Sequence, residues 1–210
     1  MVSDVKTALL VTGGDAPGLD LIRHRIEGCS FICAADSGLD VLISWKVEPD
    51  LVVGDMDSIS DPAILDRYPG TIRHPADKDE TDTEIGIREL RARGYQRILL
   101  IGGGGGRLDH LLAIRSLFDR PWGQDEWLTH RERVVRISEP TSFAVPAGST
   151  VSVFPLSTGA SGMASEGLKW PLDGLSWGPG EFGVSNQAIA PEVTVSPGKN
   201  PVLVVLPLLA

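Results

Sequence analysis

Two aspartates separated by a single residue are the first candidates for chemistry in this sequence. Asp55 and Asp57 lie in the stretch Gly54-Asp55-Met56-Asp57-Ser58, directly after the apolar run 51–53. In an extended segment both carboxylates would project to one side, and oxygen ligands of this kind hold Mg²⁺ while leaving positions for phosphate oxygens. Aspartate is also common in turns, and Gly54 already interrupts the strand, so a plain turn is the alternative.

A second acidic group occupies the stretch Asp77-Lys78-Asp79-Glu80-Thr81-Asp82. Asp82 could simply cap the helix expected to begin here, and the other carboxylates could form a solvated charge run. Carboxylates at this density, facing Asp55 and Asp57 across a crevice, would nevertheless repel one another strongly without a cation. The combination favours a metal site.

A run of glycines, Gly102–Gly106, precedes Arg107, Asp109 and His110 at the expected start of a helix. Glycine amides can approach a phosphate without obstruction by a Cβ, and a helix N-terminus attracts anions. The run is neither a Walker loop, because no Gly-Lys-Ser/Thr follows, nor a dinucleotide fingerprint. A flexible linker is the alternative for the glycines, and His110 could be a packing or capping residue.

These stretches must be positioned by the surrounding elements. From residue 1 to about 125, short β-rich runs alternate with helical patterns, which predicts a Rossmann-like parallel sheet flanked by helices. In such a sheet the loops after the strands converge on one crevice, and the candidate stretches follow strands. The expected strands are 8–11, 31–35, 51–53, a weak one at 71–73, and 97–101; the expected helices are about 19–26, 38–45, 62–68, 83–93 and 108–118.

The helix at 83–93 has the clearest boundaries. Capping-box spacing between Thr81 and Glu84 predicts its start, and Gly94 predicts its end. Residues of opposite charge also stand four apart along it, in the orientation that favours helix formation. These pairs are Glu84–Arg88 and Glu89–Arg93.

The second half has a different pattern, after a linker rich in Pro, Gly and Trp at about 120–128. In residues 130–210, apolar and polar residues alternate over short segments broken by Gly, Pro and Ser, and no segment has a convincing helical period. This pattern predicts an antiparallel β-sandwich as a second domain. The segment 157–166 has a flexible composition and no predicted role. The expected strands are 134–138, 142–145, 150–154, 183–185, 193–195 and 202–206.

Composition excludes several classes of protein. With 42% hydrophobic residues and a net charge of −9, the chain can bury a core and repels polyanions, so nucleic acid is not an expected partner. It shows no run long enough to span a membrane and no signal-peptide pattern, which favours a cytoplasmic location. Cys29 and Cys33 lie in a stretch that resembles a strand, fit no common redox or zinc spacing, and are expected to be buried thiols.

Four of these stretches, in this order, resemble the signature set of the thiamine pyrophosphokinase family. They are Asp36-Ser37-Gly38, Gly54-Asp55-Met56-Asp57-Ser58, Asp77-Lys78-Asp79-x-Thr81-Asp82 and Gly-Gly-Arg107-x-Asp109-His110. In the second half, Gly167-Leu168-Lys169-Trp170-Pro171-Leu172 and Gly183-Val184-Ser185-Asn186 resemble the family's thiamine-binding β-domain. The resemblance implies transfer of a diphosphoryl group from ATP to the hydroxyl of thiamine, giving thiamine diphosphate and AMP.

The resemblance also implies roles for individual residues. Asp55, Asp57 and Asp82 would coordinate Mg²⁺ and, with Asp109, form the catalytic group. The family is a homodimer whose thiamine site is completed by the partner's β-domain, where Ser185, Asn186 and Trp170 would receive thiamine. Trp170 could equally fill the core, and Asn186 could be a turn residue. The expected nucleotide-binding residues are Asp36, Lys78, Thr81, Gly104, Gly105 and Arg107.

Two other functions are compatible with these residues. The same fold and diphosphoryl transfer could serve another small alcohol, such as a pterin, although the pairs Lys169-Trp170 and Ser185-Asn186 argue against it. A sensor that binds nucleotide or thiamine without turnover is the other alternative, and the density of aspartates argues against that. The sequence shows no evident general base, and a metal that acidifies the attacking alcohol could make one unnecessary.

Overall fold

The computed structural model describes residues 5–209. The chain divides into two compact units, one ending at His130 and the other spanning Arg131–Leu209. Within the described residues, no helix combines the length and the apolar character that crossing a membrane requires.

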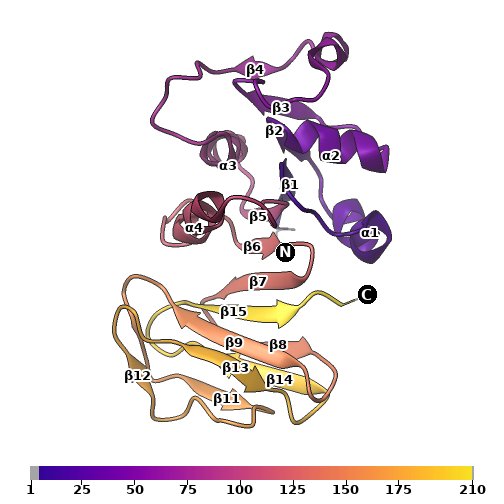
Figure 1. Ribbon diagram of the computed structural model, residues 1–210. Helices are drawn as coiled ribbons and strands as arrows, with labels where there is room; N and C mark the ends of the chain where they lie inside the picture. The colour runs from indigo at the N-terminus through magenta and orange to yellow at the C-terminus, as the bar shows by residue number, and fades with distance from the viewer. Residues whose placement is uncertain (1–4, 210) are drawn as a thin grey trace. The chain divides into compact units, whose positions relative to one another are not determined.

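The first unit is built on a parallel sheet flanked by helices, as expected (Figure 1). Its strands lie in the order β6-β5-β1-β2-β3-β4, and every neighbouring pair is parallel. Because β5 lies on the side of β1 opposite to β2, the strand order reverses between β1 and β5, and ligands bind at such a position in open sheets. The strands are β1 (Thr7–Thr12), β2 (Ile32–Ala35), β3 (Leu51–Gly54), β4 (Ile72–Arg73), β5 (Arg97–Ile101) and β6 (Glu126–Leu128).

Helices cover both faces of this sheet. In Figure 1, α1 (Leu19–Glu27) and α2 (Gly38–Trp45) lie on one face, while α3 (Asp82–Ala92) and α4 (Leu108–Leu117) lie on the other. Gly38 lets α2 approach β1 closely, since a Cβ at this position would lie 2.0 Å from the carbonyl oxygen of Val11. The first turn of α2 is therefore held firmly against the sheet.

The helix α3 begins as its sequence predicts. Thr81 is its N-cap, and the reciprocal bonds of a capping box join Thr81 and Glu84. Of the two predicted ion pairs only Glu89–Arg93 forms, at 3.5 Å. Arg88 pairs with Glu80 instead, because the carboxylate of Glu84 is engaged at the helix start.

Several boundaries differ from the sequence-based expectation. The segment 62–68 forms a 3₁₀ helix, η1 (Pro62–Arg67), and Cys29 precedes β2 rather than lying in it. Cys33 is buried in the strand, and both cysteines are free thiols. The predicted linker 120–128 ends in β6, which pairs with β5 and buries Trp127 and Leu128. Pro121 and Gly123 concealed this short strand.

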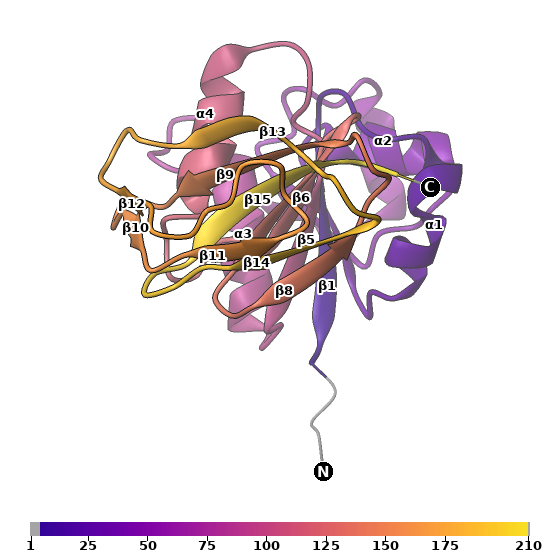
Figure 2. The same cartoon turned by 90° about the horizontal axis from the view of Figure 1, so that it is seen from below.

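The second unit is an antiparallel β-sandwich (Figure 2). One sheet has the order β13-β9-β15-β7 and the other is the three-stranded sheet β11-β14-β8. Side chains from both sheets meet in one apolar core, which includes Val135, Val153, Val195 and Val204. The strands are β7 (Glu132–Ile137), β8 (Thr141–Ala144), β9 (Thr150–Pro155), β11 (Ala164–Glu166), β13 (Gly183–Gln187), β14 (Glu192–Ser196) and β15 (Val202–Pro207).

Three short strands of this unit have no counterpart in the sequence-based expectation. They are β10 (Ala160–Ser161), β12 (Ser176–Trp177), which pairs with β10, and β11. The segment 157–166 is thus ordered, with Ala160 and Met163 buried in the core. Its many small and polar residues gave no alternating pattern, because strands of two or three residues are too short to show one.

Candidate active site

Loops from four parts of the first unit enclose a cleft of about 410 Å³. It lies where the chain leaves the carboxyl ends of β1, β2 and β5 and enters α3 and α4, the position expected for an open parallel sheet. The lining residues here include Gly13, Gly14, Asp36, Ser37, Ser58, Lys78, Glu80, Thr81, Asp82, Gly103, Gly105, Gly106, Arg107 and His110. Three of the four stretches that follow strands thus contribute several lining residues, and the loop after β3 contributes Ser58.

Three carboxylates beside this cleft could hold a metal ion together. Asp36, Asp55 and Asp57 each offer an oxygen, and these oxygens lie within 4.8 Å of one another. Asp36 is only 9% exposed, and its Oδ1 atom is buried without a hydrogen-bond partner. A buried unpaired carboxylate oxygen is costly unless a cation faces it, and three carboxylates suit a hard divalent ion such as Mg²⁺.

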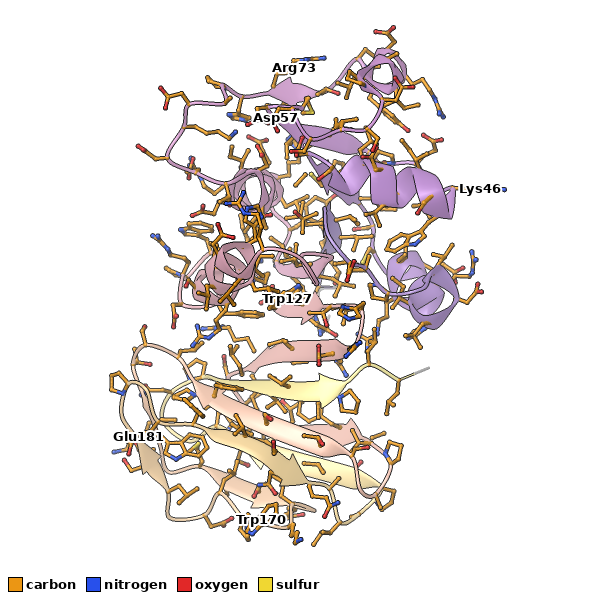
Figure 3. The ribbon with its side chains drawn as sticks, viewed as in Figure 1. Lys46, Asp57, Arg73, Trp127, Trp170 and Glu181 are labelled. Atoms are coloured by element: carbon orange, nitrogen blue, oxygen red, sulfur yellow. The ribbon has the colours of Figure 1, made fainter. Side chains whose placement is uncertain are left out.

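The segment Asp55–Asp57 is a turn, so the expectation of an extended segment was wrong. Met56 lies between the two aspartates with φ at +69° and its side chain buried, and the N–H of Asp57 donates to Oδ1 of Asp55. The carboxylates come close because the chain turns at Met56. Asp57 is labelled in Figure 3. The turn and the metal-site interpretations, posed as alternatives, are therefore compatible.

Gly54 brings the two acidic stretches into contact. Its φ is +140°, and a Cβ at this position would lie 3.1 Å from Oδ1 of Asp82 and 3.2 Å from Cβ of Asp36. Asp82 is the first residue of α3 rather than its cap, since Thr81 is the N-cap. Asp82 lies beside the group formed by Asp36, Asp55 and Asp57, but it is not a member of it.

Lys78 links the two acidic stretches electrostatically. Its Nζ atom lies 2.6 Å from Oδ2 of Asp55 and 3.3 Å from Oδ1 of Asp82. The hydrogen bond from Lys78 holds the pKa of Asp55 below its ordinary value, whereas burial raises the pKa of Asp82 and the neighbouring carboxylates add to that rise. Burial alone would lower the pKa of Lys78, but its hydrogen bonds to both aspartates raise it. The lysine therefore stays charged between them.

The glycine loop is joined to the loop after β1. The N–H of Gly103 donates to Gly13 at 2.7 Å, and Gly104 exchanges two backbone hydrogen bonds with Asp15. Gly104 therefore has no free amide to offer a phosphate, although it was expected to bind one. Among the described residues, the amides of Gly105 and Gly106 donate no hydrogen bond, and both glycines line the cleft.

The start of α4 also faces the cleft. Arg107 is its N-cap without a side-chain capping bond, so the helix end is free to attract an anion. The carboxylate of Asp109 accepts a hydrogen bond from the guanidinium of Arg107, and this bond lowers the pKa of Asp109. The side chain of Asp109 is 59% exposed and lies apart from the other aspartates. His110 lines the cleft with an exposed side chain, so it does not serve as a packing residue.

Apart from His110, one wall of the cleft was missed by the sequence interpretation. His110, Ala113, Ile114 and Leu117 line it from a single face of α4. Their spacing of three, four and seven residues is that of one helix face, so the helical period was the signal that could have found this wall. Such a surface can pack against a flat apolar group.

In the second unit, Asn186 anchors the segment that carries Trp170. The side-chain amide of Asn186 donates to the carbonyl of Trp170 at 2.6 Å, and its Oδ1 accepts from the N–H of Trp170 at 3.1 Å. Trp170, labelled in Figure 3, is 54% exposed, so it does not fill the core. The ammonium of Lys169 lies 4.7 Å from the centroid of its ring. This aromatic surface thus already attracts a cation.

Ser185 lies beside Asn186 at an irregularity of β13. Its φ is +58°, the register with β9 shifts between Gly183 and Asn186, and its N–H donates to the hydroxyl of Ser152. The side chain of Ser185 is exposed. Ser185 and Trp170 are therefore accessible to a ligand, while the amide of Asn186 is occupied by the backbone.

Both halves of the chain match family models. Residues 22–124 match "Thiamin pyrophosphokinase, catalytic domain", and residues 134–200 match "Thiamin pyrophosphokinase, vitamin B1 binding domain". These two matches together cover most of the chain, and they lie on either side of the boundary between the two structural units.

Solved structures of similar fold cover nearly the whole chain. Thiamine pyrophosphokinase from Bacillus subtilis has a TM-score of 0.81 at 21% identity, over 96% of this chain and 99% of that one. A thiamin pyrophosphokinase family protein from Enterococcus faecalis has a TM-score of 0.77 at 22% identity, over 96% and 98%. At these identities the likeness shows the fold alone.

A curated enzyme from a different family matches only part of the chain. An ATP-dependent 6-phosphofructokinase of Clostridium botulinum is 30% identical over 106 residues, which are 48% of this chain and 32% of that enzyme. The chain thus spans about a third of the length of this curated relative.

Proposed function

Because the chain belongs to the thiamin pyrophosphokinase family, we propose that it transfers a diphosphoryl group from ATP to the hydroxyl of thiamine in an Mg²⁺-dependent reaction. The products are thiamine diphosphate and AMP. The observation that carries this proposal is the group of Asp36, Asp55 and Asp57 beside a cleft with free glycine amides and an open helix start.

The acidic end of the cleft serves the metal. Asp36, Asp55 and Asp57 hold Mg²⁺ and Asp82 adjoins them, an arrangement supported by the buried unpaired oxygen of Asp36. When bound, Mg²⁺ neutralises phosphate charge and acidifies the attacking hydroxyl. The chain's residues contribute mainly alignment and charge, which are the principal requirements of phosphoryl transfer.

The glycine loop and the start of α4 hold the phosphates in this proposal. The amides of Gly105 and Gly106 and the first turn of α4 donate to phosphate oxygens, and Arg107 supplies a positive charge. Lys78 lies between Asp55 and Asp82 and can reach an oxygen of the transferred group from there. Thr81 lines the cleft, but its hydroxyl is already hydrogen-bonded in the capping box, so its role is to fix the start of α3.

Thiamine binds to the second unit in this proposal. The exposed ring of Trp170, which already attracts the Lys169 ammonium, offers a surface for the cationic thiazolium ring, and Ser185 offers its hydroxyl to the aminopyrimidine. Asn186 keeps Trp170 in place. The active form is a homodimer in which this surface of one protomer completes the site of its partner, so separated monomers would be inactive.

Substitution of single aspartates tests the metal assignment. Asp55→Asn removes one charge from the acidic group, whereas Asp79→Asn removes one charge from an exposed position outside it. We expect both variants to fold, with thiamine diphosphate formation lost in Asp55→Asn and retained in Asp79→Asn over a range of Mg²⁺ concentrations. Near-normal turnover in Asp55→Asn would refute the metal assignment.

A further inference from the structure

The metal ligands proposed above come from two separate loops that must keep a fixed separation. Asp36 lies between β2 and α2, and its N–H donates to the carbonyl of Val53 at 2.8 Å. Asp55 and Asp57 lie on the far side of Gly54, in a loop without regular structure. Backbone pairing therefore fixes Asp36, but the loop needs other contacts to hold its carboxylates in place.

The loop is attached at its distal end by the carboxylate of Asp40. Oδ2 of Asp40 accepts two hydrogen bonds from Ser60, one from the backbone N–H at 3.0 Å and one from the hydroxyl at 2.8 Å. Two apolar side chains of this loop are buried, that of Met56 between the two aspartates and that of Ile59 next to Ser60. The bonds to Asp40 complete this attachment with a charged acceptor, the stronger kind of hydrogen bond.

Asp40 belongs to the same rigid element that follows Asp36. It lies in the first turn of α2, where its N–H donates to the carbonyl of Ser37. The close contact of Gly38 with Val11 fixes that turn against the sheet. One side chain thereby ties the loop of Asp55 and Asp57 to the element that presents Asp36.

We propose that Asp40 is a positioning residue for the cation site, acting through its two hydrogen bonds to Ser60 and without touching the metal. It sets the separation between Asp36 and the pair formed by Asp55 and Asp57. Residues that orient metal ligands from outside typically change metal affinity about 10- to 100-fold when they are removed. The inference rests on the proposed metal site.

Cation binding by the protein without nucleotide or thiamine measures this role directly. Mn²⁺ is added to the full chain, and free Mn²⁺ is followed by its electron paramagnetic resonance signal for wild type, Asp40→Ala, Asp40→Asn and Ser60→Ala. Asp20→Ala is the matched control, because it removes one negative charge from a fully exposed side chain on α1. Circular dichroism melts check that each variant is folded.

The Mn²⁺ affinities of these variants distinguish the hydrogen bonds of Asp40 from its negative charge. Asp40→Ala should bind Mn²⁺ at least about tenfold more weakly, Asp40→Asn should restore most of the affinity through its amide oxygen, and Ser60→Ala should fall between them. Enzyme activity of Asp40→Ala should recover as Mg²⁺ is raised, with kcat near the wild-type value.

Other outcomes overturn the inference. If Asp40→Asn binds as weakly as Asp40→Ala, charge and not hydrogen bonding is responsible, and if both bind like Asp20→Ala, the loop is held without Asp40. Should Asp40→Ala fail to fold, undiminished binding by Ser60→Ala would count against the role. A wild-type protein that binds no Mn²⁺ contradicts the proposed metal site as well, whereas unchanged variants of a binding wild type contradict only the role of Asp40.

Discussion

A methyl group at Gly54 should disturb the acidic group directly, because it would lie against two of the aspartates. In the Gly54→Ala variant the added Cβ lies 3.1 Å from Oδ1 of Asp82 and 3.2 Å from Cβ of Asp36, closer than ordinary van der Waals contact. The backbone is also held at a φ of +140°, which side chains rarely tolerate. Both carboxylates must therefore move apart by a few tenths of an ångström.

The size of the effect follows from these two contributions. Holding alanine in such a conformation costs about 1–3 kcal/mol, and for a chain of this length each kcal/mol lowers Tm by about 2–4 °C. Misplacing reacting groups by about 1 Å can cost a factor of about 100 in rate, so a smaller shift predicts a loss of roughly ten- to a hundredfold. We therefore expect a large loss in the rate of thiamine diphosphate formation in a variant that still folds.

The assay compares Gly54→Ala with Gly70→Ala by thermal melting and by the rate of thiamine diphosphate formation. A Cβ at Gly70 meets no atom within 4 Å, and Gly70 takes no part in the site, so this control measures the general effect of adding a methyl group. If Gly54→Ala were as stable and as active as Gly70→Ala, the packing of Asp36 and Asp82 around Gly54 would be wrong.

Three further predictions follow from individual contacts. Thr81→Ala removes the hydroxyl of the capping box and should lower the free energy of unfolding by about 1 kcal/mol in a urea titration; an unchanged midpoint would contradict the cap. Asn186→Ala frees the backbone of Trp170 and should raise KM for thiamine while leaving KM for ATP unaltered, so equal changes in both would argue against its anchoring role. Burial raises the pKa of Cys29 to about 11 and of Cys33 to about 12, so at pH 8 the native thiols should react at least about a hundredfold more slowly than the unfolded ones. Since only the unfolded chain loses these protons above pH 9, stability should decline from pH 9 to about 11 through Cys29 and to about 12 through Cys33. Fast labelling of the native protein would speak against this burial.

The strand–helix order of the first unit was predictable because its signals are local. Apolar runs of four or five residues, the capping box of Thr81 and the break at Gly94 each specify structure within a few positions. β6 was missed because its three residues follow a segment rich in proline and glycine, and its pairing with β5 is a long-range contact. Strands of that length become visible only from their neighbours in the sheet.

The candidate site was predictable in its location and less so in its detailed contacts. Loops after parallel strands converge whatever their conformation, so Asp36, Asp55 and the glycine loop were expected at one edge of the sheet. The left-handed conformation of Met56 and the hydrogen bonds that occupy the amide of Asn186 depend on tertiary packing and have no local signature. For that reason only the structure shows that the turn at Asp57 is compatible with a metal site, and that Trp170 does not fill the core.

The products formed from ATP, Mg²⁺ and thiamine test the central claim most directly. The purified protein is incubated with all three, and nucleotides and thiamine phosphates are separated by chromatography. We expect AMP and thiamine diphosphate to appear in equal amounts, and neither to appear when thiamine or Mg²⁺ is left out. ADP with thiamine monophosphate, or no thiamine-dependent product at all, would contradict diphosphoryl transfer to thiamine.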